Sequence, residues 1–294
     1  MRLAIGVSGG KGGTGKSFVA TSIARLLSKD YSVVLADLDV EAPNDHILVG
    51  LKELGNPEPI EVFFPFIDYS KCTSCGACAK VCDTGAIVMS RGRPPFVMPR
   101  LCSGCKACYY ACPYDAIVPG GRVIGYTHKA VLDGLVLVTG VIREGEEHTL
   151  PAIVVAKKRA MEEAREADIL IVDTGAGTGN SISSALQGVS LLIAVTEPTP
   201  LGLHDLRGIL EIARSMGLRS WLVVNRAGIG PDDKHIALAR EYGVEKVFRI
   251  PFSKNAARAY AEGRLVVEAY PEDPASKALL EITHAIKELL EDGG

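Results

Sequence analysis

One short stretch restricts the fold of this chain more than any other: a glycine-rich loop between an apolar run and a helix-like segment. Residues 3–7 are typical of a buried strand, and residues 18–27 of a helix. The residues 10–17 read Gly-Lys-Gly-Gly-Thr-Gly-Lys-Ser and match the pattern G-x-x-x-x-G-K-[S/T]. In that pattern, backbone N–H groups and a helix N-terminus surround phosphate oxygens, the lysine meets the β- and γ-phosphates, and the hydroxyl binds Mg²⁺. A glycine turn formed by chance would lack the flanking strand and helix, so we assign those roles to Lys16 and Ser17.

Apolar strand-like runs and helical segments alternate along the rest of the chain. This alternation predicts an α/β fold with a doubly wound, mainly parallel sheet, in which ligands bind at the carboxyl ends of the strands. The further strands are expected at residues 32–36, 123–126, 135–142, 169–173, 191–196 and 221–226, and the further helices at 152–167, 202–216 and 275–290.

Acidic residues stand at the ends of two of these predicted strands. Asp37 and Asp39 follow the run 32–36, and Asp173 ends the run 169–173. Two residues apart on an extended chain, Asp37 and Asp39 point to the same side. An acid that ends a buried strand is the expected Mg²⁺-binding partner of the phosphate loop, so we predict that role for Asp173.

All eight cysteines lie between residues 72 and 112, in two copies of C-x-x-C-x-x-C-x-x-x-C thirty residues apart. Ala-Ile-Val follows each copy at the same distance, so the segment is an internal duplication. The spacing is that of the bacterial two-cluster ferredoxin run, in which the fourth cysteine of each motif ligates the other cluster. A zinc ribbon is the alternative, but such sites usually pair two C-x-x-C knuckles across a longer gap. The predicted ligand sets for two 4Fe-4S clusters are Cys72, Cys75, Cys78 and Cys112, and Cys102, Cys105, Cys108 and Cys82.

The cysteine run interrupts the strand–helix alternation. We predict an inserted α+β two-cluster ferredoxin-like domain at 61–118, within a discontinuous phosphate-binding domain made of 1–60 and 119–294. The stretch from Gly55 to Pro65, with prolines at 57, 59 and 65, predicts a linker into the insert, and Gly120-Gly121 predicts a turn after it.

Overall composition limits the classes of function. The net charge of −3 gives no general footprint for nucleic acid. No apolar run approaches the ~18 residues of a membrane span, and Met1-Arg2 leads straight into a strand. We therefore expect a cytoplasmic protein that binds neither membrane nor nucleic acid.

The loop form G-K-G-G-T-G-K-S, with its early Lys11, resembles the deviant Walker A motif of the MinD/ParA/Mrp/nitrogenase iron protein group. The whole chain resembles P-loop ATPases of the MinD superfamily that contain an inserted ferredoxin domain. The resemblance implies hydrolysis of ATP with Mg²⁺ and a homodimer stabilised by ATP, in which Lys11 reaches the partner's nucleotide. It also implies that Asp39 positions the attacking water, while Asp37 lies near the Mg²⁺ shell.

The same resemblance implies further nucleotide contacts. Asn225 at a strand exit corresponds to the adenine-contacting residue of the group, and Pro251-Phe252 to the loop that closes over the base. The family commonly has D-x-P-P-G after the strand that ends in Asp173, whereas this chain has Gly175-Ala176 in place of the prolines. The implied nucleotide-binding set is Gly10, Lys11, Gly12, Gly13, Thr14, Gly15, Lys16, Ser17, Asn225, Arg226, Pro251 and Phe252.

Three functions are compatible with these motifs. The first is an ATPase that couples its nucleotide state to electron transfer through two 4Fe-4S clusters, with an unidentified redox partner protein. The second is an ATP-dependent factor that assembles or delivers Fe-S or other metallocofactors, although the C-terminal C-x-x-C of Mrp-type relatives is missing. The third is a non-redox positioning ATPase of MinD/ParA type, which gives the cysteine run no purpose.

Overall fold

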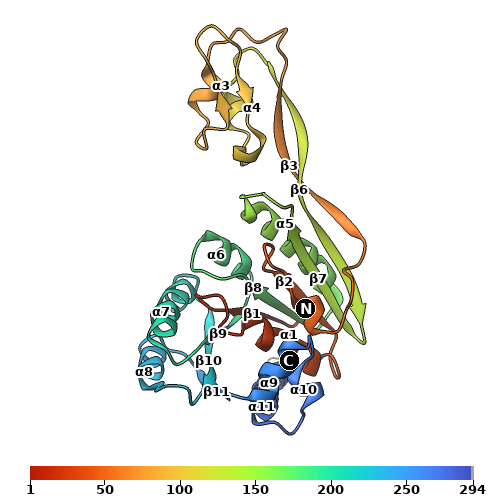
Figure 1. Ribbon diagram of the computed structural model, residues 1–294, viewed down its shortest axis with the longest axis vertical. Coiled ribbons are helices and arrows are strands. Elements are labelled where there is room, and N and C mark those ends of the chain that lie inside the picture. The colour runs from red at the N-terminus through yellow and green to blue at the C-terminus, as the bar shows by residue number, and fades with distance from the viewer. Residues whose placement is uncertain (293–294) are drawn as a thin grey trace. The chain divides into compact units, whose positions relative to one another are not determined.

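The computed structural model describes residues 1–292 and forms two compact units (Figure 1). The sheet unit consists of Met1–Pro57, Thr127–Val141 and the chain from Ile153 onward. The cysteine unit consists of Glu58–Tyr126 and Ile142–Ala152, and it contains all eight cysteines. The two chemistries predicted from the sequence therefore fall in separate units.

A parallel sheet is the centre of the sheet unit. Its strands lie in the order β11-β10-β9-β1-β8-β2-β7, and every pairing along this series is parallel. Most are short runs of Val, Ile and Leu that are buried on both faces, as expected for parallel strands covered by helices. The bounds are β1 (Leu3–Ser8), β2 (Val33–Leu38), β7 (Leu135–Ile142), β8 (Ile169–Thr174), β9 (Leu191–Thr196), β10 (Arg219–Ala227) and β11 (Lys246–Pro251).

Helices cover both faces of this sheet (Figure 1). The helices α1 and α11 pack on each other against one face, while α6 and α7 lie against the other. The predicted α/β class and the mainly parallel sheet are confirmed. The helices of this unit are α1 (Lys16–Leu27), α2 (Asp45–Leu48), α5 (Thr149–Glu163, whose first turn is in the cysteine unit), η2 (Ala164–Glu166), α6 (Asn180–Leu186), α7 (Pro200–Ser215), α8 (Asp233–Glu241), α9 (Lys254–Ala261), α10 (Val266–Ala269) and α11 (Pro274–Asp292).

The cysteine unit is small and repeats one pattern twice. Each cysteine run contains a short helix and is followed by a strand. A buried cluster of Cys78, Ile87, Cys108 and Ile117 joins the two copies. Its elements are β3 (Pro57–Ile67), α3 (Ala77–Lys80), β4 (Ile87–Val88), β5 (Phe96–Val97), η1 (Pro99–Leu101), α4 (Ala107–Ala111) and the part of β6 (Ile117–Leu132) up to Tyr126.

The predicted linker at 55–65 is wrong, because the chain forms strand β3 from Pro57. Beyond β7 the hydrogen-bonded strand order continues through β6 to β3, so among the described strands β3 has a neighbour on one edge only. The prolines at 57, 59 and 65 all have odd numbers, and their missing N–H groups therefore fall on one side of the strand. An edge strand tolerates proline on its unpaired side.

The predicted turn at Gly120-Gly121 is also wrong, because both glycines lie inside β6. A Cβ on Gly120 would lie 2.2 Å from Cε2 of Phe66, so glycine here permits close packing against β3. As a result, the compact unit extends to Tyr126 and takes in Ile142–Ala152, beyond the predicted limits of 61–118. Within residues 1–292, no helix is both long and apolar enough to span a membrane.

Candidate functional site

The loop between β1 and α1 has the backbone that its glycines predict. Gly13 and Gly15 have φ values of 83° and 94°, in the left-handed region that favours glycine. A Cβ on Gly15 would lie 2.2 Å from Nδ2 of Asn225, and one on Gly10 would lie 2.5 Å from Cβ of Asp205. The loop is therefore tightly enclosed and leads into the N-terminus of α1, where free N–H groups attract anions.

Lys16 and Ser17 begin α1 and lie where the motif requires them. Lys16 is only 6% exposed, and its Nζ donates to the carbonyl oxygen of Lys11 at 3.2 Å. Ser17 Oγ donates to Oδ2 of Asp173 at 2.6 Å. The lysine thus folds over the loop, and the hydroxyl contacts the acid at the end of β8.

Asp37 organises the chain that follows β2. Its carboxylate accepts hydrogen bonds from the backbone N–H groups of Asp39, Asn44 and Asp45, at 3.2, 3.0 and 3.1 Å. These bonds fold residues 39–45 back onto the end of the strand. They also fix where Asp45 begins α2.

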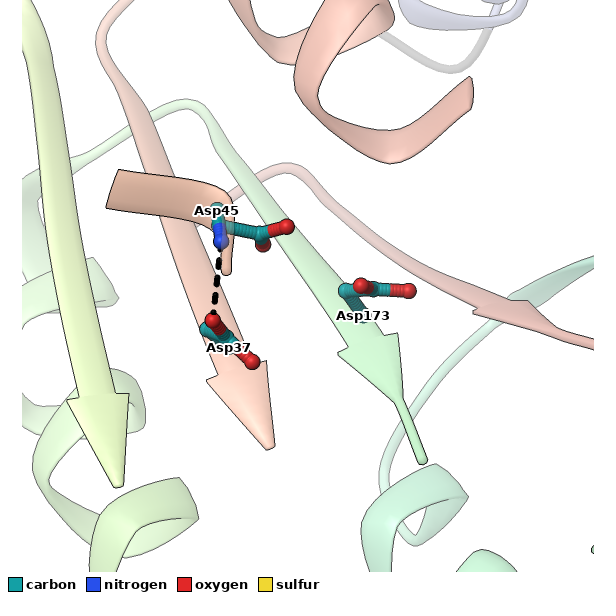
Figure 2. Close-up of side chains that lie close together, drawn as sticks. All are labelled: Asp37, Asp45 and Asp173. Carbon is teal, nitrogen blue, oxygen red and sulfur yellow. Dashed lines mark hydrogen bonds between the residues drawn. The ribbon is translucent and has the colours of Figure 1, made fainter. Parts of the chain in front are cut away.

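Three carboxyl groups converge beside Ser17 (Figure 2). Asp37 and Asp173 are register partners on the neighbouring strands β2 and β8, and Asp45 enters from α2. One oxygen from each carboxyl lies within 4.8 Å of the other two, and all three residues are buried. The sequence predicts Asp37 and Asp173 here, but it gives no signal for Asp45, which follows no strand.

Burial controls the charge of this acidic cluster. It raises the pKa of Asp173 to about 7, although the Ser17 hydroxyl and Lys16 oppose the rise. Burial, and then repulsion from neighbouring carboxylates, also raise the pKa values of Asp37 and Asp45. Oxygen ligands with excess negative charge are what Mg²⁺ prefers, so the donor set fits that ion.

Asp39 lies outside the cluster, in the loop that follows β2, and it faces the loop that follows β8. A Cβ on Gly175 would lie 3.3 Å from Oδ1 of Asp39. Burial raises the pKa of Asp39, and the charge of Lys16 opposes that rise. The backbone N–H of Gly177 donates to the carbonyl of Gly10 at 2.9 Å, so the loop after β8 is linked to the phosphate loop.

A cavity of about 260 Å³ opens beside the glycine loop. Its lining includes Asn225, Pro251 and Phe252, the three residues implied to contact the base. Nδ2 of Asn225 donates to the carbonyl of Thr14 at 2.8 Å. The Asn225 amide therefore braces the phosphate loop as well as lining the cavity. Sequence reasoning missed Phe18 and Tyr260, whose rings give the cavity its apolar walls. The lining residues are Gly13, Gly15, Phe18, Asn225, Arg226, Ile250, Pro251, Phe252, Ser253, Ala256, Ala257 and Tyr260.

Lys11 is held by its own chain in this structure. Its Nζ lies 3.6 Å from Oε1 of Glu197, whose other oxygen accepts a hydrogen bond from Arg226 at 2.9 Å. Glu197 is 8% exposed and follows β9 directly. The carboxylate of Glu197 thus joins the phosphate loop to Arg226, which lines the cavity beside the glycine loop.

The eight cysteines form two cages in the cysteine unit. One cavity is lined by Cys72, Cys75, Cys78 and Cys112, and the other by Cys82, Cys102, Cys105 and Cys108. All eight are free thiols, and burial raises the pKa values of Cys78, Cys102 and Cys108. A bound metal centre would supply the positive charge that the buried thiolates lack.

In each cage of the described chain, the sulfur atoms are spread more widely than they are around a bound zinc ion. Zinc holds thiolates at about 2.3 Å, which places the sulfurs roughly 3.8 Å apart. Among residues 1–292, the one group of three or more His, Cys, Asp or Glu ligand atoms within 4.8 Å of one another is the acidic cluster. In neither cage, therefore, do three sulfurs of the described residues lie as close together as they do around a bound zinc ion.

Comparison with known proteins agrees with the geometry of the phosphate loop. A model of the CobQ/CobB/MinD/ParA nucleotide binding domain matches residues 5–266. The chain belongs to this family. The MinD/ParA resemblance inferred from Lys11 and the glycine loop is confirmed at the level of the superfamily.

Individual proteins that this chain is similar to extend the comparison. "Uncharacterized protein MJ0579" of Methanocaldococcus jannaschii is 30% identical over 259 residues, which cover 88% of this chain and 89% of that protein. The cytosolic Fe-S cluster assembly factor NBP35 of Eremothecium gossypii is 29% identical over 146 residues, covering 43% of this chain and 44% of that protein. The septum site-determining protein MinD with Mg-ADP from Pyrococcus horikoshii has a TM-score of 0.63 at 17% identity, covering 100% of this chain and 99% of that chain.

Proposed function

We propose that the protein is an ATPase that couples its nucleotide state to electron transfer through two 4Fe-4S clusters. Lys16 and the N–H groups of the loop bind the β- and γ-phosphates, while Ser17 and Asp173 bind Mg²⁺. ATP and water give ADP and phosphate, and catalysis consists of positioning and charge neutralisation. The observation that supports this half of the proposal is the Ser17–Asp173 hydrogen bond at 2.6 Å, which brings the two Mg²⁺ ligands together.

Asp39 is proposed to orient the attacking water. It lies beside Lys16 and against Gly175, where the loops after β2 and β8 meet, and it belongs to neither the acidic cluster nor a salt bridge within the described chain. Its carboxylate is therefore available to accept a hydrogen bond from water. Lys11 is proposed to complete the site of a partner subunit in an ATP-stabilised homodimer, after leaving Glu197.

The two cages are proposed to hold one 4Fe-4S cluster each. Four cysteines line each cavity in the crossed arrangement expected from the duplicated run, with Cys112 completing the first set and Cys82 the second. When bound, such a cluster accepts and releases one electron at a time. Cys78 and Cys108 belong to one buried apolar cluster, so the two cages are neighbours within the unit. The protein would thus accept single electrons from a low-potential donor protein and pass them to an acceptor protein.

A redox titration tests the proposal directly. Anaerobically purified protein is expected to contain about eight irons per chain and to bleach reversibly on reduction with dithionite. Midpoint potentials are then measured with Mg-ATP, with Mg-ADP and without nucleotide. Potentials and electron-transfer rates that are identical in all three states would exclude coupling, and colourless, iron-free protein would exclude the clusters.

Cofactor assembly is the second candidate, and one observation favours it: the match to the assembly factor NBP35. That match covers less than half of either protein, so the activity is proposed here only as an alternative. Incubation with an apo-ferredoxin separates the two functions. Reversible reduction without loss of iron indicates electron transfer, whereas movement of iron to the apo-ferredoxin indicates assembly.

A further inference from the structure

The carboxylate of Asp45 has no counter-charge in the chain. Asp45 is 0% exposed, and within residues 1–292 no N–H or hydroxyl group donates to either of its carboxylate oxygens; the neighbour that could share a proton with it is the carboxyl of Asp173. In Figure 2 its carboxylate points toward Asp173. A buried ionised group without a partner is strongly destabilising unless a proton or a cation neutralises it.

The backbone commits Asp45 to this position. Its own N–H donates to Oδ2 of Asp37 at 3.1 Å, so the residue cannot turn to solvent without breaking the bonds that fold 39–45 onto β2 (Figure 2). Asp173 also keeps one carboxylate oxygen, Oδ1, without a partner among the described residues. Two buried acids therefore direct unsatisfied oxygens into the same small space.

The spacing of the three acids fits one hard cation. Their ligand oxygens lie within 4.8 Å of one another. In an octahedral shell with metal–oxygen distances of about 2.1 Å, neighbouring oxygens are roughly 3 Å apart and opposite ones roughly 4.2 Å. Lys16 is the lysine near Asp173, but its Nζ donates a hydrogen bond to the carbonyl of Lys11 at 3.2 Å. The single positive charge of Lys16 therefore cannot balance the three carboxylates of the acidic cluster when all three are ionised.

We propose that Asp45 turns the Mg²⁺ site into a three-carboxylate site that binds a divalent cation without nucleotide. The inference rests on the proposed function only in that the same cation would later meet the phosphates of ATP. A P-loop site usually binds Mg²⁺ through one or two protein groups together with the phosphates of the substrate. Here the protein itself contributes three carboxylates and the hydroxyl of Ser17, so the cation stays bound when the nucleotide leaves.

Manganese binding to nucleotide-free protein tests this inference. The protein is stripped of metal with EDTA, and Mn²⁺ is titrated while the free ion is followed by EPR. We expect one Mn²⁺ per chain in the acidic cluster, displaced by excess Mg²⁺. Asp45→Asn should weaken this binding by about tenfold or more, because it removes one negative ligand and keeps the shape of the side chain.

Glu41→Gln is the matched control, because it removes an exposed carboxylate from the same loop and should leave the affinity unchanged. Thermal melting provides a second measurement. Mn²⁺ should raise the melting temperature of the nucleotide-free wild type but not that of Asp45→Asn. Asp45→Ser is the substitute if the asparagine variant fails to fold.

Two outcomes would overturn the inference: no Mn²⁺ bound by the wild type below about 1 mM, or equal affinity in the wild type and the Asp45 variants. The first is also expected if Asp45 keeps a proton and donates it to Asp173. A protein that binds Mg-ATP but binds no Mn²⁺ in its nucleotide-free state would refute this inference and leave the proposed function standing. Mn²⁺ binding without any ATP hydrolysis would do the reverse.

Discussion

The sheet unit and the cysteine unit are stabilised in different ways. The sheet unit has a large apolar core in which strands pack against α1 and α11. The buried cluster of the cysteine unit has four members, Cys78, Ile87, Cys108 and Ile117, and two of them are proposed cluster ligands. The first unit therefore folds around side chains that only pack, whereas the second would gain stability from the clusters proposed for its thiols. Damage to one unit should spare the other.

The largest expected effect tests the sheet unit alone. Lys16→Ala removes the cation proposed to stabilise the transferred phosphoryl group, so ATP hydrolysis should fall by at least about a hundredfold. Iron content and the visible spectrum should not change, because no cysteine is touched. Iron analysis beside a phosphate-release assay measures both. Parallel loss of iron would show that the two units are not independent.

The reverse experiment removes a ligand from the cysteine unit. Cys72→Ser should reduce the iron content by about half, because each set of four is proposed to hold one of two clusters. Limited proteolysis should then cut within Glu58–Tyr126 while nucleotide affinity stays at the wild-type level. An unchanged cluster spectrum would refute the proposed ligand set.

A stability test compares loss of packing in the sheet unit with metal content in the cysteine unit. Lys157, on α5, donates from Nζ to the carbonyls of Ser184, Ala185 and Gln187 at the end of α6. Lys157→Met leaves these buried acceptors without a donor and should destabilise the sheet unit by about 2 kcal/mol. Chemical denaturation measures the loss, and iron content serves as the control. A variant as stable as the wild type would mean that water replaces the lysine.

The smallest expected effect distinguishes the two cages from each other. Arg122 donates to the carbonyl of Cys102 at 3.3 Å and forms an ion pair with Glu146. Burial raises the pKa of the Cys102 thiol, and the charge of Arg122 opposes that rise. Because a nearby positive charge favours the reduced state, Arg122→Gln should lower the midpoint potential of the cluster bound by Cys102. Potentiometric titration should show that the midpoint potential of the other cluster is unchanged. Equal shifts of both potentials would contradict a specific effect of Arg122 on the cluster bound by Cys102.

The two units also differ in how much their sequences reveal. Local spacing predicts the glycine loop, Lys16, Ser17 and both cysteine sets, because three or four ligands come from one short stretch. Strand ends predict Asp37 and Asp173, since the carboxyl ends of parallel strands meet at one edge of the sheet. Asp45 could not be predicted in this way, because its position depends on three backbone hydrogen bonds to Asp37. The linker was mispredicted because the side of a strand on which a proline falls depends on the neighbouring strands.

Glu197 forms ion pairs with Lys11 and Arg226 within the chain, and this bears on how the proposed dimer would form. Its single carboxylate is shared by Lys11 and Arg226, and Arg226 also lines the base cavity. In the proposed dimer, Lys11 has to exchange this carboxylate for the phosphates of a neighbouring subunit. An isolated chain therefore pairs Lys11 with its own Glu197. In the proposed dimer the nucleotide of the neighbouring subunit competes for this lysine, so self-association should depend on nucleotide concentration as well as on protein concentration.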